Sequence, residues 1–493
     1  MEAVDRAGFL RRAGAVALAA PYARSALSAP SALPPVLAEL QRHVKPGAVL
    51  GRTSPGYDAA RLIYNTRYDA YKPLAVVYCT TVADVQQTIT WARRHSIHIT
   101  PRGGGHSYGG YSSIPGGVIV DVSKMKRVSV LAGGKARIGA GAKLIDVYAG
   151  LGAHGMAIPA GSCATVGIGG QVLGGGIGFL SRKFGATCDN LAGLTLVTAD
   201  GSARTCSPTQ NSDLYWASRG GGGGNFGIAT EYVFRTHAVS AVSTFSASFP
   251  WAKAAAVVAA WQAWAPHAPD ELFSVVNLSN ASGGSPSLHV SGQLVGPASR
   301  LSTLLGPLVS AVPPDSLSVK DRPFLQAVQY WAGCGPITKC RLAPAGELTR
   351  GTFFAKSDYV RKPLSAASVG VITSALERVP TRAALLLDSY GGALNRVPKA
   401  ATAFVHRDML CSLQYLVYWD APSQSPGAVA WLRAFYAAMR PYVTGEAYVN
   451  YIDPDLAAHP QAYYGSNLPR LKSIKRRYDP GNLFHFKQSI PLY

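Results

Sequence analysis

The sequence predicts an α+β protein in which strands joined by glycine-dense loops come first and an antiparallel sheet covered by helices comes second. Apolar runs at 76–79 and 97–101 enclose a segment with helical spacing of its apolar residues, which indicates a β-α-β unit. After residue 239 glycine clusters become rare, and strand-like and helix-like segments alternate. We therefore expect a first domain over 36–238, a second over 239–445, and a segment over 446–493 that returns to the first.

In the first domain, a helix is expected over 82–94 because Val82, Val85, Ile89 and Ala92 recur at helical spacing. Residues 167–178 contain too many glycines for an ordinary helix or strand, so we expect backbone that packs against another group. The remaining elements expected here are strands at 76–79, 97–101, 117–121, 137–141, 194–199 and 227–234, and a short helix at 144–150.

In the second domain, strands are expected at 272–278 and 288–294, and helices at 254–264 and 365–377. This pattern is typical of a sheet with helices on one face. No repeat of fixed period occurs.

Composition limits the possible functions. The chain has 493 residues, of which 48% are hydrophobic and 15% charged, as in a globular protein. Its net charge of +21 is spread along the chain, so we expect no nucleic-acid partner, although attraction to anionic glycans stays open. No run reaches the roughly 18 apolar residues of a membrane span. We expect a monomer.

Residues 1–30 predict an export signal. Arg11 and Arg12 precede an apolar stretch, and the segment from Asp5 to Arg11 resembles a twin-arginine signal in which Ala7 replaces one arginine. The twin-arginine route exports folded proteins. We therefore expect a secreted or periplasmic protein. An ordinary signal, or a misassigned start on a cytoplasmic protein, is the alternative.

The seven cysteines show no spacing of a zinc site, and we expect no metal. Cys334 and Cys340 are close enough in sequence to form a disulfide in an exported protein, a question that the sequence leaves open. Buried thiols are expected at Cys79, Cys188, Cys206 and Cys411, which have apolar neighbours.

Two nucleophilic side chains lie inside glycine-dense loops. His106 follows Arg102-Gly103-Gly104-Gly105, and Cys163 lies within Pro159–Gly167. Glycines have no Cβ and let the backbone approach a flat ligand closely. The two loops together therefore predict a flavin held from two sides, with a covalent bond to each side chain. Small neighbours set Cys163 apart from the other cysteines.

A nicotinamide cofactor is the obvious rival. The sequence has one G-x-G-x-x-G match, at 222–227, but a strand-like run from Ile228 to Phe234 follows it. A dinucleotide fold needs a helix at that point to bind the pyrophosphate. We expect these glycines instead to form an anion nest from consecutive backbone N–H groups.

These motifs, taken in order, resemble those of berberine-bridge-enzyme-like flavoproteins of the vanillyl-alcohol oxidase superfamily. The resemblance covers nearly everything after residue 60 and rests on 102–106, 161–178, 182–185 with 189–190, 220–227, 447–451, 463–467, 479–482 and 488–491. It implies a two-part FAD-binding domain of the vanillyl-alcohol oxidase (PCMH) type and a separate substrate-binding domain.

The resemblance implies FAD attached twice, through its 8α-methyl group to His106 and through C6 to Cys163. The alternatives are a hydrogen-bonded loop imidazole and a small buried residue. The other FAD-binding residues that it implies are Arg102, Gly103, Gly104, Gly105, Ser107, Gly161, Thr165, Val166, Gly167, Gly169, Gly170, Gly175, Gly176, Gly178, Gly227, Ile228, Tyr448 and Asn450.

It also implies Tyr451 as the catalytic base and Asp388 as its partner, the arrangement of the carbohydrate oxidases. A phenol titrates near 10 and needs such help near neutral pH. Asp388 as a turn cap and Tyr451 as a core aromatic are the alternatives. Gln414, Tyr108 and Tyr390 are placed on the substrate side, with a half-buried strand residue and a loop aromatic as the simpler interpretations of Gln414 and Tyr108.

Val166 falls at the family's oxygen-gate position, where a small residue favours an oxidase. The implied reaction is oxidation of an alcohol, most simply the anomeric hydroxyl of a sugar or oligosaccharide to a lactone, with hydride transfer to flavin N5 and reduction of O2 to H2O2. Two alternatives stay open: a tailoring oxidase of a glycosylated natural product, and a secreted flavoprotein whose main role is binding.

Overall fold

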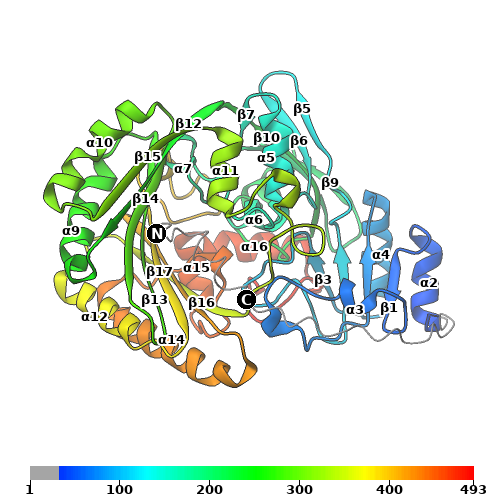
Figure 1. Cartoon of the computed structure of the whole chain (residues 1–493). Coiled ribbons are helices and arrows are strands. Elements are labelled where there is room, and N and C mark those ends of the chain that lie inside the picture. The colour runs from blue at the N-terminus through cyan, green and yellow to red at the C-terminus, as the bar shows by residue number, and fades with distance from the viewer. Residues whose placement is uncertain (1–32) are drawn as a thin grey trace.

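The computed structural model describes residues 33–493, so the predicted export signal lies outside the described residues. Figure 1 shows two halves: smaller sheets with the N-terminal helices on one side, and a large sheet with helices along its outer face on the other. The C-terminal helices α15 (His459–Tyr464) and α16 (Leu468–Tyr478) lie between them.

The predicted β-α-β unit is present in a four-stranded sheet of order β1-β2-β4-β3. Strands β2 and β3 both pair in parallel with β4. Thr81 and Asp84 cap α4 reciprocally, each side chain accepting from the other residue's backbone N–H, at 3.1 and 2.9 Å. The elements are α2 (Pro35–His43), β1 (Val49–Gly51), α3 (Tyr57–Ala60), β2 (Ala75–Tyr78), α4 (Val82–Arg94), β3 (Ile99–Arg102) and β4 (Val118–Asp121).

A second, antiparallel sheet of order β5-β6-β10-β8-β9 follows. The glycine match at 222–227 leads into strand β10, as expected, and not into a helix. The elements are β5 (Val128–Leu131), β6 (Lys135–Gly139), α5 (Leu144–Gly152), β7 (Met156–Ala157), α6 (Ile168–Leu173), α7 (Ser181–Phe184), β8 (Leu191–Val197), β9 (Ala203–Cys206), α8 (Ser212–Ala217), β10 (Ile228–Arg235) and β11 (His237–Ala238).

The expectation for 167–178 was wrong in its first half, because Ile168–Leu173 forms helix α6. Two glycines inside it cost roughly 1 kcal/mol each in helix propensity. Ile168 and Val172, four residues apart, lie on one side and are fully buried in the core. Burial of this apolar pair outweighs the glycine cost, which propensity alone does not show.

The second domain is a seven-stranded antiparallel sheet of order β15-β12-β14-β13-β17-β18-β16. Figure 1 shows α9, α10, α12 and α14 along its outer face. The elements are β12 (Ala241–Phe249), α9 (Ala254–Trp264), β13 (Leu272–Ala281), β14 (Ser287–Leu294), α10 (Ala298–Ala311), β15 (Ser316–Pro323), α11 (Phe324–Ala332), β16 (Phe353–Val360), α12 (Ala366–Glu377), β17 (Arg382–Ser389), α13 (Ala393–Arg396), β18 (Cys411–Tyr418) and α14 (Ser425–Met439).

The C-terminal segment contacts both halves. Buried Lys475 on α16 donates to Asn225 O at 2.8 Å and pairs with Asp479 at 2.5 Å. Tyr464 donates to Gly221 O at 3.0 Å. These bonds tie α15 and α16 to the glycine loop that precedes β10.

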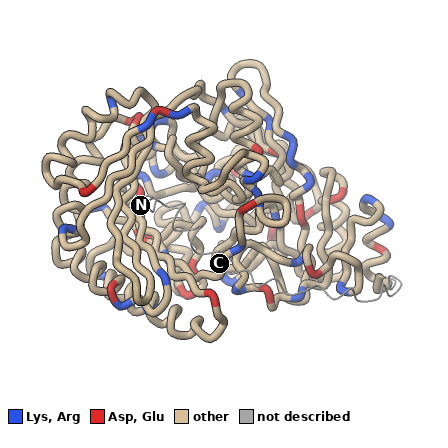
Figure 2. Tube along the Cα trace, viewed as in Figure 1, with Lys and Arg blue, Asp and Glu red and all other residues tan. Residues whose placement is uncertain are grey.

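Cys334 and Cys340 form a disulfide, and the four cysteines expected as buried thiols are buried. Lys and Arg are interspersed with Asp and Glu over the chain (Figure 2). Within residues 33–493, no helix is long and apolar enough to cross a membrane, and no group of three His, Cys, Asp or Glu side chains is placed to hold a metal ion.

Candidate functional site

A cavity of about 250 Å³ lies where the loop after β3, the Cys163 loop, helix α6 and the C-terminal segment meet. Both nucleophiles, His106 and Cys163, line it. The other predicted site residues that line it are Arg102, Gly103, Gly104, Gly105, Ser107, Tyr108, Gly161, Val166, Gly167, Gly169, Gly170, Gly227, Ile228, Tyr448, Asn450 and Tyr451.

Glycine is required where the two nucleophile loops touch. A Cβ on Gly104 would lie 2.2 Å from the backbone N of Gly167, and a Cβ on Gly167 would lie 2.4 Å from the N of Gly104. The two backbones therefore pack directly against each other. This contact brings His106 and Cys163, which are 57 positions apart, to one cavity.

His106 is held in a defined position as a neutral base. Its ring stacks on Tyr64 with centroids 4.0 Å apart, and its Nε2 is hydrogen-bonded to Thr165 Oγ1 at 3.0 Å. Burial, and then the positive charge of Lys143, lower the pKa of His106 well below its usual value. The imidazole is therefore uncharged at neutral pH, as a nucleophile must be.

The cavity fits a flat ligand with a polar edge. The amide Nε2 and Oε1 of Gln171, which lines the cavity, are both buried without a hydrogen-bond partner among residues 33–493. A Cβ built on Gly170 meets no atom of the described chain within 4 Å. Gly222 and Gly224, both with positive φ, line the same cavity and suit the expected anion nest. These are the features that FAD needs.

Tyrosines form the side of the site toward the sheet. Tyr451 stacks on Tyr108, with ring centroids 5.4 Å apart and planes at 7°, and meets the edge of Tyr448 at 4.9 Å. Tyr448 OH accepts from the backbone N of Gly176 at 2.7 Å and from Asn450 Nδ2 at 2.9 Å. Tyr448 and Asn450 thus fix the turn that carries Tyr451.

The sheet contributes buried polar side chains. Gln414 on β18 donates to Tyr108 OH at 2.7 Å, which joins the second domain to the His106 loop. Asp388 on β17 is 2% exposed and lies opposite Ser412 of β18. Burial raises the pKa of Tyr390, and the neighbouring acidic groups of Asp388 and Tyr451 raise it further. Asp388 and Tyr451 therefore both act electrostatically on Tyr390.

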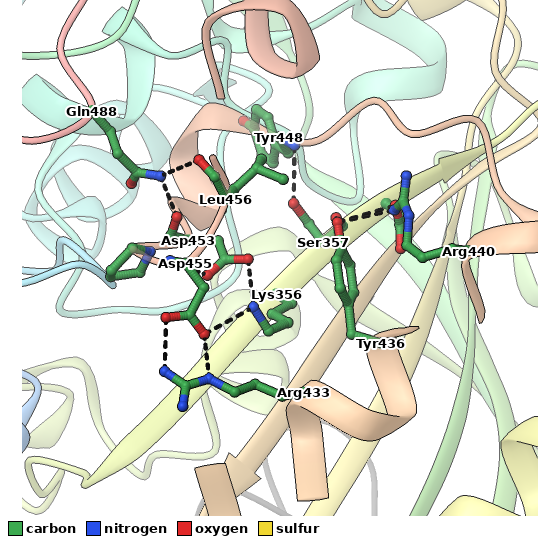
Figure 3. Close-up of polar contacts among 12 residues, drawn as sticks. Lys356, Ser357, Arg433, Tyr436, Arg440, Tyr448, Asp453, Asp455, Leu456 and Gln488 are labelled. Atoms are coloured by element: carbon green, nitrogen blue, oxygen red, sulfur yellow. Dashed lines mark hydrogen bonds and ion pairs between the residues drawn. The ribbon is translucent and has the colours of Figure 1, made fainter. Parts of the chain in front are cut away.

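The turn that carries Tyr451 is anchored to β16 (Figure 3). Ser357 Oγ accepts from the backbone N of Tyr448 at 3.0 Å. Lys356, 3% exposed, binds Asp453 at 2.7 Å and Asp455 at 3.3 Å, and Arg433 closes the network on Asp455. The residues on both sides of Tyr451 are thus fixed to the second domain.

Comparisons with known proteins agree with this geometry. Residues 73–207 match the FAD binding domain family, and residues 447–491 match the berberine and berberine-like family. An uncharacterized FAD-linked oxidoreductase, YgaK, of Bacillus subtilis is 36% identical over 90% of this chain and 97% of its own length. A solved structure of BBE-like 1 from Physcomitrella patens is 34% identical, with a TM-score of 0.85 over 93% of this chain and 99% of that one.

The chain belongs to the berberine-bridge-enzyme-like FAD-linked oxidases. It therefore binds FAD, and its fold is the α+β PCMH-type fold that the sequence predicted. A chitooligosaccharide oxidase structure is 28% identical to it, with a TM-score of 0.84 over 93% of this chain and 99% of that one.

Some residues predicted for this family member lie beside the cavity and do not line it. Thr165 acts through His106, as described above. Three predicted glycines pack tightly against other parts of the chain. A Cβ on Gly175 would lie 2.9 Å from Phe404, and one on Gly176 would lie 2.2 Å from Thr187. A Cβ on Gly178 would lie 1.8 Å from the carbonyl oxygen of Ala160. Tyr390 is fully buried, and its hydroxyl is 3.1 Å from that of Tyr359.

Sequence reasoning missed several residues of the site. Tyr64 contacts it and belongs to no recognised motif, and Gln171 lines it from within the 161–178 motif, where only other residues were predicted. Tyr359 and Lys143 lie beside it, and Lys143 donates to Gly104 O at 2.9 Å. An isolated lysine in an Ala-Gly-Ala-Lys-Leu run is the only signal that Lys143 offered.

Proposed function

We propose that this enzyme oxidises an alcohol, the anomeric hydroxyl of a sugar or oligosaccharide, to a lactone and passes the electrons to O2 to form H2O2. One observation carries the proposal. Tyr451 lines the same cavity as His106 and Cys163 and stacks on Tyr108, whose hydroxyl binds Gln414 of the sheet. The likeness to a chitooligosaccharide oxidase supports a sugar substrate.

His106 and Cys163 hold the FAD by two covalent bonds in this proposal. Both side chains line one cavity from loops that touch at Gly104 and Gly167. Thr165 engages Nε2 of His106, so we assign the flavin bond to Nδ1. Cys163 has no disulfide partner and is half-buried at the cavity. When bound, FAD accepts the hydride and reduces O2.

Tyr451 takes the proton of the substrate hydroxyl, and Asp388 assists it. Their common electrostatic effect on Tyr390 supports this pairing. A general base of this kind contributes about 10²- to 10⁴-fold to the rate. Val166 lines the cavity close to Cys163, and a small side chain there leaves space for O2 beside the flavin.

The sheet offers a polar face for sugar hydroxyls. Residues directly opposite on antiparallel strands share a face, and Asp388 lies opposite Val275. On that face Asn277 is opposite His289, and Ser291 is opposite both Val275 and Ser246. The Asn277 amide atoms, His289 Nδ1 and Ser246 Oγ are buried without a hydrogen-bond partner among residues 33–493. Unmet polar groups of this kind suit a polyhydroxyl ligand.

The other face of the same strands is apolar. Leu278, Leu288 and Val290 pack there with Trp261 of α9 and Ile372 of α12 in the second hydrophobic core. The sheet therefore directs its polar residues to the side away from these helices.

We further propose that the enzyme is exported. The disulfide between Cys334 and Cys340 supports an oxidising compartment.

A panel of mono- and oligosaccharides tests the proposed reaction. We expect H2O2 and a lactone in equal amounts from at least one sugar, with O2 consumed in the same ratio. Absence of peroxide from every sugar, together with peroxide from a glycosylated natural product, would replace this proposal with a tailoring oxidase. Ligand binding without turnover would indicate a binding protein.

A further inference from the structure

The two nucleophile loops need a component that sets their alignment. Gly104 and Gly167 touch through backbone atoms, and the hydrogen bond from Thr165 of the Cys163 loop to the His106 ring is a second contact between the loops. Two covalent bonds to one rigid ring require both nucleophiles to be placed at once. A side chain that joins the backbone of one loop to the other would add to this alignment.

Residues 142–145 run along the Cys163 loop. Leu144 N donates to Val166 O at 2.9 Å, Ile145 N donates to Ala164 O at 3.0 Å, and Ile168 N donates to Ala142 O at 3.0 Å. Lys143 itself forms an isolated antiparallel bridge with Gly167. The backbone of Lys143 is thus part of the Cys163 side of the site.

The side chain of Lys143 reaches the other loop. Its Nζ donates to Gly104 O at 2.9 Å, two residues before His106. A hydrogen bond from an ammonium group is stronger than a neutral one. Lys143 therefore joins the Cys163 loop through its backbone to the His106 loop through its side chain.

The charge of Lys143 acts on His106 as well. After burial, Lys143 is the second cause that lowers the pKa of His106. Burial lowers the pKa of Lys143 itself to about 8, with Asp121 opposing the shift, so most of the charge remains at neutral pH. A neutral imidazole keeps the lone pair that bond formation needs.

We propose that Lys143 is a positioning residue for flavin attachment, which aligns the His106 loop with the Cys163 loop and keeps His106 reactive. The inference rests on the proposed bicovalent FAD. We expect loss of the Lys143 side chain to slow formation of the His106 bond more than that of the Cys163 bond, because main-chain hydrogen bonds hold the Cys163 loop without the lysine side chain.

Lys143→Met tests this, because it keeps the length of the stem and removes the donor and the charge. Full-length protein prepared without flavin is incubated with FAD and digested at intervals, and the flavin on the His106 peptide and on the Cys163 peptide is quantified by mass and absorbance. We expect the His106 bond to form about tenfold more slowly, the factor for a lost positioning interaction of about 1.4 kcal/mol. The Cys163 bond should change less than threefold.

Lys487→Met is the control for loss of a lysine donor, because Lys487 also donates to a backbone carbonyl, Pro454 O, at 2.8 Å, and Pro454 belongs to neither nucleophile loop. Lys143→Arg, which keeps charge and donor, should recover most of the His106 bond. If Lys143→Met does not fold, Lys143→Gln serves in its place, and melting curves accompany every variant.

The outcomes separate the two proposals. Wild type without flavin on either peptide would overturn the bicovalent proposal and this inference with it. Wild type with flavin on both peptides, and Lys143→Met with both bonds formed at the wild-type rate, would overturn the role of Lys143 alone.

Discussion

The two sides of the candidate site are built differently. On the FAD side the cavity is lined largely by glycine backbone, and a Cβ at Gly104 would lie 2.2 Å from a neighbouring main-chain atom. On the sheet side Gln414 binds the hydroxyl of the cavity-lining Tyr108, and Asp388 and Asn277 are buried polar side chains of the sheet. We therefore expect a substitution on the first side to alter the fold and FAD binding, and one on the second to alter substrate binding and turnover in the reaction that we propose.

Removing the Tyr451 hydroxyl is the sharpest test of that contrast. Tyr451→Phe should lower kcat by about 10²- to 10⁴-fold, because the base is lost, and leave flavin content and Tm near wild type. Stopped-flow flavin reduction and peroxide release measure it. The kcat of Asp388→Asn should lie between that of Tyr451→Phe and that of the wild type.

Tyr442→Phe is the control for this pair, since Tyr442 is 37% exposed. A Tyr451→Phe enzyme with less than a tenfold loss would show that another group is the base.

The junction between the two sides is tested at Lys356. Lys356→Met leaves the buried carboxylate of Asp453 without its cation, so unfolding free energy should fall by about 3 kcal/mol. Turnover should fall too, because the Tyr451 turn loses its anchor. Chemical denaturation and kcat measure these effects.

Adding Asp453→Asn to Lys356→Met should restore part of the stability. Lys183→Met, which breaks a more exposed pair with Glu271, should cost less than about 1 kcal/mol. Equal losses of unfolding free energy in Lys356→Met and Lys183→Met would show that the buried network in Figure 3 stabilises the protein no more than an exposed ion pair does.

The backbone-lined side is tested at Gly104. Gly104→Ala forces the two loops apart and should cost about 1–3 kcal/mol in stability, together with loss of FAD. Gly370→Ala on α12, where a Cβ meets no described atom within 4 Å, should instead stabilise by about 0.5–1 kcal/mol. Tm and the ratio of flavin to protein absorbance report both. A Gly104→Ala protein that keeps full flavin would contradict direct backbone packing.

The smallest expected effect is acid sensitivity at Asp455. Its hydrogen bond with Arg433, and the nearby charge of Lys356, lower the pKa of Asp455 to about 2. A lowered carboxylate pKa adds stability that is fully present above about pH 4 and is lost as the pH falls toward 2. The Tm difference between wild type and Asp455→Asn should stay constant from pH 7 to 5 and disappear near pH 2. A Tm difference that persists at pH 2 would show that altered packing, and not the charge of Asp455, causes it.

Local sequence patterns predicted helices in both domains. Helix α4 spans Val82–Arg94 as its apolar spacing indicated, and α9 spans Ala254–Trp264 as expected. The glycine-rich α6 was missed, since its stability comes from buried Ile168 and Val172. Periodic spacing of apolar residues indicates an element with one continuous apolar face. It does not indicate a short element that is stabilised by packing against its neighbours.

The sequence by itself determined the two nucleophiles, the glycines around them and the tyrosine segment, because each lies within a short run whose residue types indicate its chemistry. Only the tertiary structure decided how Tyr64 stacks on His106, how Gln414 binds Tyr108 across 306 positions, and how Lys143 joins the two loops. These contacts depend on strand register and on loops meeting in space. A contact between residues distant in the chain leaves no local pattern, because only the folded backbone brings the two partners together.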